Sequence, residues 1–294
     1  MPVSYIKDAI FDRLSKIGYT TQELDMPSIR GVLKESLLNG ENLDVKIFSD
    51  REFEVKFSQN SYYQILATDF YYSFQKVYEQ SNFLKLSNAK SPVAWLLVST
   101  YYSSFYSAIE LSKLFGTYNV YLKKEHCQSI ISHTNNSNIL QKGNYVGIVN
   151  TDVTDYITVR FSATEKSQPH DLAWRNMSRI LDFHNIADIR PTKVEQIKFI
   201  KSIFNSSFKA LQTPNNVRND WNYSFANAYD HSFCADISDI RTFLNENGRK
   251  SILSLPRNFK RNSNKQNNVY AIIYVEAILR QAMIDLKTRI LKCN

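Results

Sequence analysis

The segment that most constrains the fold of this chain is an apolar, aromatic-rich stretch over residues 94–112. It follows Ser91 and Pro92, a pair that suits a helix N-cap and first turn, and Gly116 suits its end. Apolar side chains at helical spacing share one face, and further apolar and aromatic side chains cover the other faces. The pattern predicts a central helix that is buried on more than one side.

Apolar periods of three and four also dominate the rest of the chain. They predict helices over residues 6–17, 27–40, 61–83, 169–184, 194–211, 237–248 and 269–290. Strand-like alternation is confined to short runs, namely 43–48 and 53–57, which predict a small hairpin, and 145–149 and 156–161, which predict a ribbon. The expected fold class is therefore mainly α.

Two regions are expected along the chain. Residues 1–60 are predicted to form N-terminal helices and the small hairpin, and residues 61–294 a helical domain. Within that domain, residues 117–167 are polar and asparagine-rich, with too few apolar side chains for a core of their own. We interpret them as a β-ribbon insertion between core helices.

The composition excludes several functional classes. Only seven glycines and no Walker-type or dinucleotide fingerprint argue against a nucleotide cofactor. The first eight residues are charged where a signal peptide needs an apolar run, and no run of uncharged apolar residues is long enough to cross a membrane. We therefore expect a cytoplasmic protein with no cofactor and no membrane partner.

The cysteines are too far apart for a disulfide framework or a zinc site. They are Cys127, Cys234 and Cys293. The only close cluster joins Cys127 with His126 and His133, and we interpret it as chance placement on a helix surface. We therefore expect no bound metal.

The excess positive charge lies near the end of the chain. The net charge is +8, and residues 249–294 contain ten Lys and Arg but only two Asp and Glu. The basic stretch consists of Arg249, Lys250, Arg257, Lys260, Arg261 and Lys265. Such a stretch either binds phosphate groups of a nucleic acid or is a solvated basic loop, and both interpretations stay open.

The passage over residues 214–224 is the strongest candidate for a functional site. It places amides, a guanidinium, a carboxylate, an indole and a phenol in one short run between helical segments. Core packing does not account for so many polar groups, so we expect an exposed, rigidly held site at a helix junction. The structural alternative is that Arg218 pairs with a carboxylate such as Asp220, while Trp221 and Tyr223 pack between helices.

Together, the aromatic segment 94–108 and the run 218–223 resemble the HEPN superfamily. Its members are helical bundles with a short motif of an Arg, usually a polar neighbour, and then a His. The resemblance covers about residues 61–225, interrupted by the insertion. It implies a HEPN-like bundle, a homodimer, and a metal-independent endoribonuclease of toxin–antitoxin or antiviral defence type, with RNA as substrate and an antitoxin or a defence complex as partner.

This chain matches the motif at two positions and differs from it at one. Arg218 matches the Arg and Asn219 its polar neighbour, whereas Tyr223 stands where the family has His. Arg218 would bind a phosphate and stabilise charge in the transition state. A phenol with a pKa of about 10 is a poor general base at neutral pH but can act as an acid or hydrogen-bond donor.

Three functions therefore stay open from the sequence. The first is an endoribonuclease that uses Arg218, Asn219 and Tyr223, with RNA drawn in by the basic stretch. The second is a HEPN-like RNA-binding or regulatory subunit that has lost catalysis together with its His. The third is a helical module that binds other proteins through its aromatic faces.

Overall fold

The computed structural model describes residues 2–24, 27–40, 43–86, 92–134, 139–150, 155–164, 169–183, 191–205, 213–223 and 265–292. The described helices are α1 (Pro2–Lys16), η1 (Ile29–Gly31), α2 (Leu33–Asn39), α3 (Gln59–Leu86), α4 (Val93–Leu114), α5 (Lys124–Ser132), α6 (Pro169–Asp182), α7 (Pro191–Asn205), α8 (Pro214–Tyr223) and α13 (Lys265–Ile290). The described strands are β1 (Asp44–Ser49), β2 (Glu52–Ser58), β3 (Thr117–Leu122), β4 (Gly143–Val149) and β5 (Tyr156–Thr164).

The chain divides into two compact units, and several long helices contribute to both. Unit 1 comprises Met1–Lys7, Phe74–Ala108 and Met177–Ile284. Unit 2 comprises Asp8–Ser73, Ile109–Asn176 and Asp285–Asn294. All described strands belong to unit 2, whereas the part of unit 1 that the structure describes is helical.

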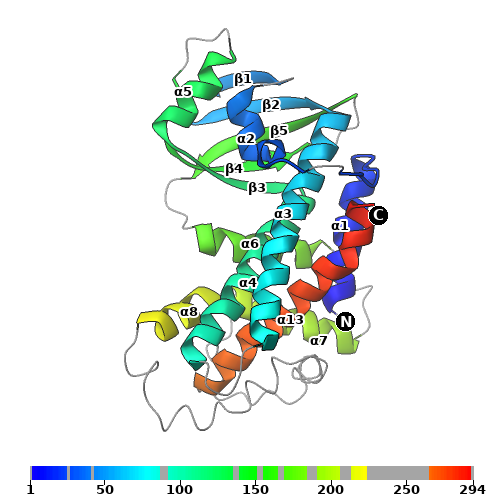
Figure 1. The fold of residues 1–294 in the computed structure, drawn as a ribbon, viewed down its shortest axis with the longest axis vertical. Helices are drawn as coiled ribbons and strands as arrows, with labels where there is room; N and C mark the ends of the chain where they lie inside the picture. Colours follow the sequence, from blue (N-terminus) through cyan, green and yellow to red (C-terminus); the bar gives the residue numbers. More distant parts are fainter. Residues whose placement is uncertain are drawn as a thin grey trace. The chain divides into compact units, whose positions relative to one another are not determined.

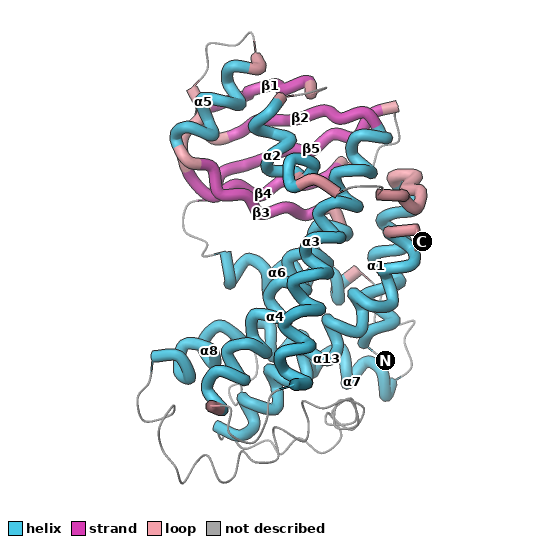
Figure 2. Tube along the Cα trace, viewed as in Figure 1, coloured by secondary structure: helices cyan, strands magenta, loops and turns pink. Residues whose placement is uncertain are grey.

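The strands of unit 2 form one antiparallel sheet with the order β1-β2-β5-β4-β3 (Figures 1 and 2). The hairpin β1–β2 pairs through β2 with β5, from Glu52 opposite Ser162 to Ser58 opposite Tyr156. In turn β4 pairs with β5 on one side and with β3 on the other. Helices α2 and α5 lie over one face of this sheet (Figure 1).

The prediction of a mainly α, HEPN-like bundle with a separate hairpin and ribbon insertion is wrong. The hairpin and the ribbon share one five-stranded sheet, so the fold is mixed α and β. The cause lies in β2, where Phe53, Val55 and Phe57 are all fully buried. A two-stranded hairpin alone cannot bury the apolar face of β2, and pairing β2 with β5 extends the hairpin into a sheet that does. Strand β3, which comes shortly after α4, was not predicted from the alternation of apolar residues.

Aromatic rings fill the buried side of the sheet. Phe53 and Phe161, on the adjacent strands β2 and β5, stack with ring centroids 4.8 Å apart. The ring of Tyr145 on β4 meets Phe53 edge-on at 5.5 Å. These cross-strand contacts fix the register, because a slip by one residue would turn the aromatic side chains to the opposite face.

Unit 1 is built around its segments of α4 and α13. On α4, the buried side chains include Leu96, Leu97 and Tyr101, which point in different directions around the helix. The prediction that this helix is buried on more than one side is therefore confirmed. Phe199 of α7 meets the ring of Tyr274 of α13 edge-on at 5.4 Å.

The close approach of β4 and β5 predicts a strong dependence on the side chain at position 147. A Cβ at Gly147 would lie 2.5 Å from the Phe161 ring, which is fully buried and already stacked on Phe53. Because that ring cannot move away freely, we expect Gly147→Ala to lower the free energy of unfolding by about 1–3 kcal/mol. Chemical denaturation measures this change.

The matched control lies in the same strand. A Cβ added at Gly143 meets no atom within 4 Å, so Gly143→Ala is expected to leave stability nearly unchanged. Equal stability of the two variants would show that Phe161 does not limit the space at position 147.

Candidate functional site

The polar passage that the sequence singles out is a helix, α8, and not an irregular junction. Pro214 occupies its first position, where a missing N–H costs nothing. The Thr213 hydroxyl accepts a hydrogen bond from the Asn216 N–H at 3.4 Å, in the manner of an N-cap. Asparagines that favour turns in isolation are therefore held in helical geometry by the proline and the cap.

Helix α8 has a buried side and a more exposed side. Asn215, Val217 and Trp221 are buried. Arg218 is half-buried, as is Asn219, whereas 74% of Tyr223 is exposed at the end of the helix. The structural alternative is thus confirmed for Trp221, which packs inside, but the phenol of Tyr223 faces solvent.

Arg218 lies between two aromatic rings of unit 1. The centre of its guanidinium is 5.4 Å from the ring centroid of Tyr101, a buried side chain of α4, and 6.0 Å from that of Tyr223. Its Nη2 donates a hydrogen bond to Oδ1 of Asn215 at 3.1 Å. The electron-rich ring faces attract the cation without neutralising it.

Among the described residues, no carboxylate pairs with Arg218. Its contacts are the amide of Asn215 and the two rings, and its Nε is buried without a hydrogen-bond partner in the part of the chain that the structure describes. The alternative of an ion pair with Asp220 is therefore not observed. A half-buried guanidinium with donor capacity to spare can bind an anion from outside the chain.

The structure thus places two of the three predicted site residues, Arg218 and Tyr223, side by side. Most of the predicted basic stretch lies outside the residues that the structure describes. Tyr223 and Arg218 are in contact, and Asn219 is the next residue on the same helix. The predicted helix 237–248 and the basic residues Arg249 to Arg261 lie outside the described residues. Lys265 is the first residue of α13.

Sequence reasoning missed the partner of Arg218 on α4. Tyr101 belongs to the apolar face that the helical period identifies, so it was assigned to the core. It is indeed buried, yet one face of its ring is available to the guanidinium. Only the juxtaposition of α4 and α8 reveals this second role.

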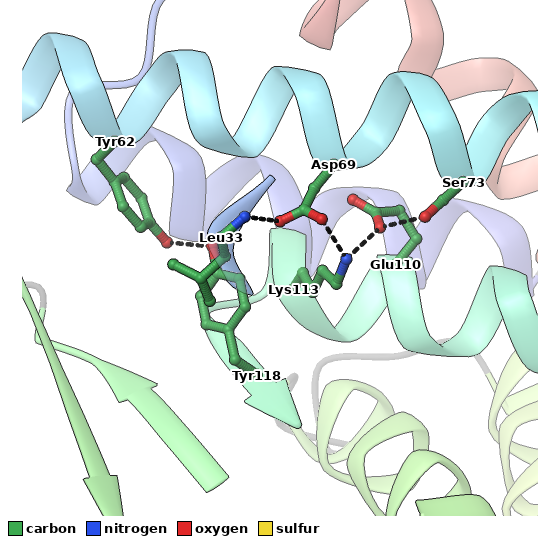
Figure 3. Close-up of polar contacts among 7 residues, drawn as sticks. All are labelled: Leu33, Tyr62, Asp69, Ser73, Glu110, Lys113 and Tyr118. Atoms are coloured by element: carbon green, nitrogen blue, oxygen red, sulfur yellow. Dashed lines mark hydrogen bonds and ion pairs between the residues drawn. The ribbon is translucent and has the colours of Figure 1, made fainter. Parts of the chain in front are cut away.

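A second polar cluster, in unit 2, was not foreseen either (Figure 3). Lys113 of α4 places its Nζ 2.7 Å from Oδ1 of Asp69 on α3 and 3.2 Å from Oε2 of Glu110. Ser73 donates to the same Glu110 oxygen at 2.8 Å, and the Leu33 N–H donates to Asp69 Oδ2 at 3.3 Å. One lysine therefore joins two carboxylates, one of which also binds the first residue of α2.

Burial and charge oppose each other in this cluster. Burial raises the pKa of Glu110, and the positive charge of Lys113 partly offsets the effect. Burial would lower the pKa of Lys113, but the carboxylates of Asp69 and Glu110 outweigh it and hold that pKa above its usual value. Glu110 is fully buried, so we assign the cluster to holding the helices together and not to contact with a substrate.

The histidines of the small histidine and cysteine cluster make hydrogen bonds to backbone groups, one local and one to α2. His126 Nδ1 accepts from the Lys123 N–H at 3.2 Å, and a ring nitrogen of His133 lies 2.9 Å from the Leu38 carbonyl oxygen. Cys127 is buried, which raises its pKa. Among the described residues, no group of three or more His, Cys, Asp or Glu side chains could hold a metal ion.

Comparison with protein-family models, curated proteins and solved structures found no match for this chain. Across the helices that the structure describes, none combines the length and apolar character needed to span a membrane.

The lysine of the buried cluster gives a prediction about stability and pH. Lys113→Met leaves the carboxylates of Asp69 and Glu110 without their cation, so we expect it to lower the free energy of unfolding at neutral pH by about 3–5 kcal/mol. Burial raises the pKa of Glu110 above that of an ordinary carboxyl group, and loss of the Lys113 charge raises this pKa further. Protonation of Glu110 then removes a charge that has lost its partner, so the loss of stability should shrink as the pH falls from neutral towards the ordinary carboxyl range. Denaturation at several pH values measures both effects.

Lys198, exposed in the middle of α7, supplies the control. Lys198→Met is expected to change stability little at any of these pH values. A pH-independent loss for Lys113→Met would contradict the assignment of the effect to a buried carboxyl group.

Proposed function

We propose that α8 carries a binding site for single-stranded RNA. In this proposal Arg218 binds a backbone phosphate, and the exposed ring of Tyr223 stacks on an adjacent base. The observation that supports it most is a half-buried guanidinium that contacts two aromatic rings and no carboxylate among the described residues. A cation next to an exposed aromatic ring suits the alternation of phosphate and base along a flexible strand.

The chemistry of the site favours RNA binding over protein binding. Arginine presents a planar fork of donors that matches phosphate oxygens, and stacking on an aromatic ring accepts any base. The predicted basic stretch of Arg249, Lys250, Arg257, Lys260, Arg261 and Lys265 would add attraction that does not depend on RNA sequence. The resemblance of Arg218 and Asn219 to the HEPN motif supports the same choice of ligand.

Cleavage of the bound RNA is a second candidate, favoured by the contact between the Tyr223 ring and Arg218. In such a reaction the ribose 2′-hydroxyl would attack the phosphorus and lose its proton to a base, and the bond from phosphorus to the 5′-oxygen would break. The guanidinium would stabilise charge on the phosphate in the transition state, and the phenol would donate a proton to the leaving 5′-oxygen. No described histidine belongs to unit 1, where this site lies, so a histidine acting as the second proton-transfer group would have to come from residues outside the described ranges or from another copy of the chain.

The remaining expectations from the resemblance stay predictions. A homodimer would bring two copies of Arg218 to one RNA, and a defence-complex or antitoxin partner would regulate it. The proposal places the protein in the cytoplasm, where RNA is the abundant single-stranded nucleic acid.

The central prediction concerns Arg218. We expect Arg218→Ala to weaken binding of a single-stranded RNA oligonucleotide about 10- to 100-fold, because one phosphate contact and its counterion release are lost. The slope of log affinity against log salt should fall in magnitude by about 0.7. Fluorescence anisotropy across a salt series measures both, and gel analysis of the same samples reports whether the RNA is cut.

Arg179, exposed on α6 in unit 1, is the matched control. Arg179→Ala is expected to keep most of the affinity. The proposal fails if folded Arg218→Ala protein binds RNA as tightly and with the same salt slope as the wild type, or if the wild type does not bind RNA.

Two variants of Tyr223 separate stacking from proton transfer. Tyr223→Ala is expected to weaken RNA binding by about 1–3 kcal/mol, because a stacking surface is removed. Tyr223→Phe keeps that surface and should retain binding, but it should abolish any cleavage that needs the phenol. Anisotropy and gel assays on both variants test this, and equal binding by Tyr223→Ala and the wild type would rule out the stacking role.

A further inference from the structure

Unit 2 contains a cavity of about 350 Å³ that the RNA proposal does not use. It lies where η1 and α2 meet the start of α3, elements that Figure 1 shows beside one another. Its described lining consists of Arg30, Gly31, Ser36, Asn39, Leu43, Ser61 and Ile65. The volume falls within the range of pockets that hold small molecules.

The cavity is polar and carries one cation. Arg30 has an exposed side chain with no ion pair among the described residues. Its backbone, in contrast, is fixed, because its N–H donates to Ser28 Oγ at 3.3 Å and the Gly31 N–H donates to the Ser28 carbonyl oxygen at 2.9 Å. The guanidinium is therefore attached to an ordered turn while its donors remain available.

Hydroxyl groups extend the donor set. Ser58 donates its hydroxyl hydrogen to Ser61 Oγ at 2.8 Å and accepts the Ser61 N–H at 3.2 Å. The Ser61 hydroxyl hydrogen is not used in these two bonds and can be donated into the cavity. The described lining contains no acidic side chain, so no fixed negative charge on it opposes an anion.

We propose that this cavity binds a small phosphorylated metabolite. Arg30 would bind the phosphate through its fork of donors, as arginine does at phosphate sites. Ser36, Asn39 and Ser61 would bind hydroxyl groups of the ligand body, and Leu43 with Ile65 would contact its carbon atoms. Small-molecule sites are usually lined mainly by apolar side chains, so this more polar lining suits a charged, hydroxyl-rich ligand such as a sugar phosphate or a mononucleotide.

The site does not depend on the RNA proposal. All of its lining residues belong to unit 2, whereas Arg218, Tyr101 and Tyr223 belong to unit 1. Loss of RNA binding in an Arg218 variant would therefore leave ligand binding at Arg30 unchanged, and the two proposals fail or stand separately.

The test is binding of ribose 5-phosphate, AMP, inorganic phosphate and, for comparison, citrate to the full chain, measured by calorimetry and by the shift in Tm. We expect ribose 5-phosphate or AMP to bind and to raise Tm, and Arg30→Ala to lose at least about 10-fold in affinity. Ser36→Phe leaves Arg30 in place but fills the cavity, and it is also expected to lose binding. The exposed Arg175 of α6 provides the control, since Arg175→Ala should bind as the wild type does.

Three outcomes would overturn the proposal, and each contradicts a different part of it: the existence of the site, its location or its ligand class. Absence of binding by the wild type to all three phosphates at about 10 mM overturns the site itself. Unchanged affinity in folded Arg30→Ala or Ser36→Phe protein places the ligand elsewhere. Binding of citrate but of none of the phosphates shows that the ligand class is a carboxylate.

Discussion

The arrangement of unit 2 depends on the pairing of Lys113 with Asp69 and Glu110. Three charged groups are taken out of water at the contact of α3 and α4, which is favourable only when each charge has partners of good geometry. The bond from the Leu33 N–H to Asp69 extends the same constraint to α2. Because these bonds need the side chains of α3 and α4 and the start of α2 at set distances, the cluster opposes sliding or rotation of the helices.

Local features could be predicted from the sequence because they depend on neighbouring residues. The α4 helix and the β1–β2 hairpin follow from the apolar period, and the positive φ angles of Gly40 and Gly116 mark the ends expected for two helices. The assembly of the sheet could not be predicted in this way. Pairing of β2 with β5 joins residues about a hundred positions apart, and a single sequence contains no signal for that pairing.

The same distinction between local and long-range information applies to the candidate site. The sequence identified Arg218 because an arginine among amides and aromatics has no ordinary role in a core. Its setting depends on Tyr101, a residue of another helix, and on the absence of a carboxylate contact among the described residues. Likewise, Lys113, Asp69 and Glu110 all belong to predicted helices. Only the distances from the Lys113 Nζ to the two carboxylates show that these side chains form one ionic cluster.

The order of strands in the sheet also has a consequence for synthesis of the chain on the ribosome. The hairpin β1–β2 emerges early, but the strand that covers its open edge, β5, emerges about a hundred residues later. During that interval β2 presents unpaired backbone groups beside Phe53, Val55 and Phe57, a combination that invites pairing with other chains. The open edge of β2 therefore stays without its native partner until residue 164 has left the ribosome, and this interval is when we expect the nascent chain to be most prone to aggregation.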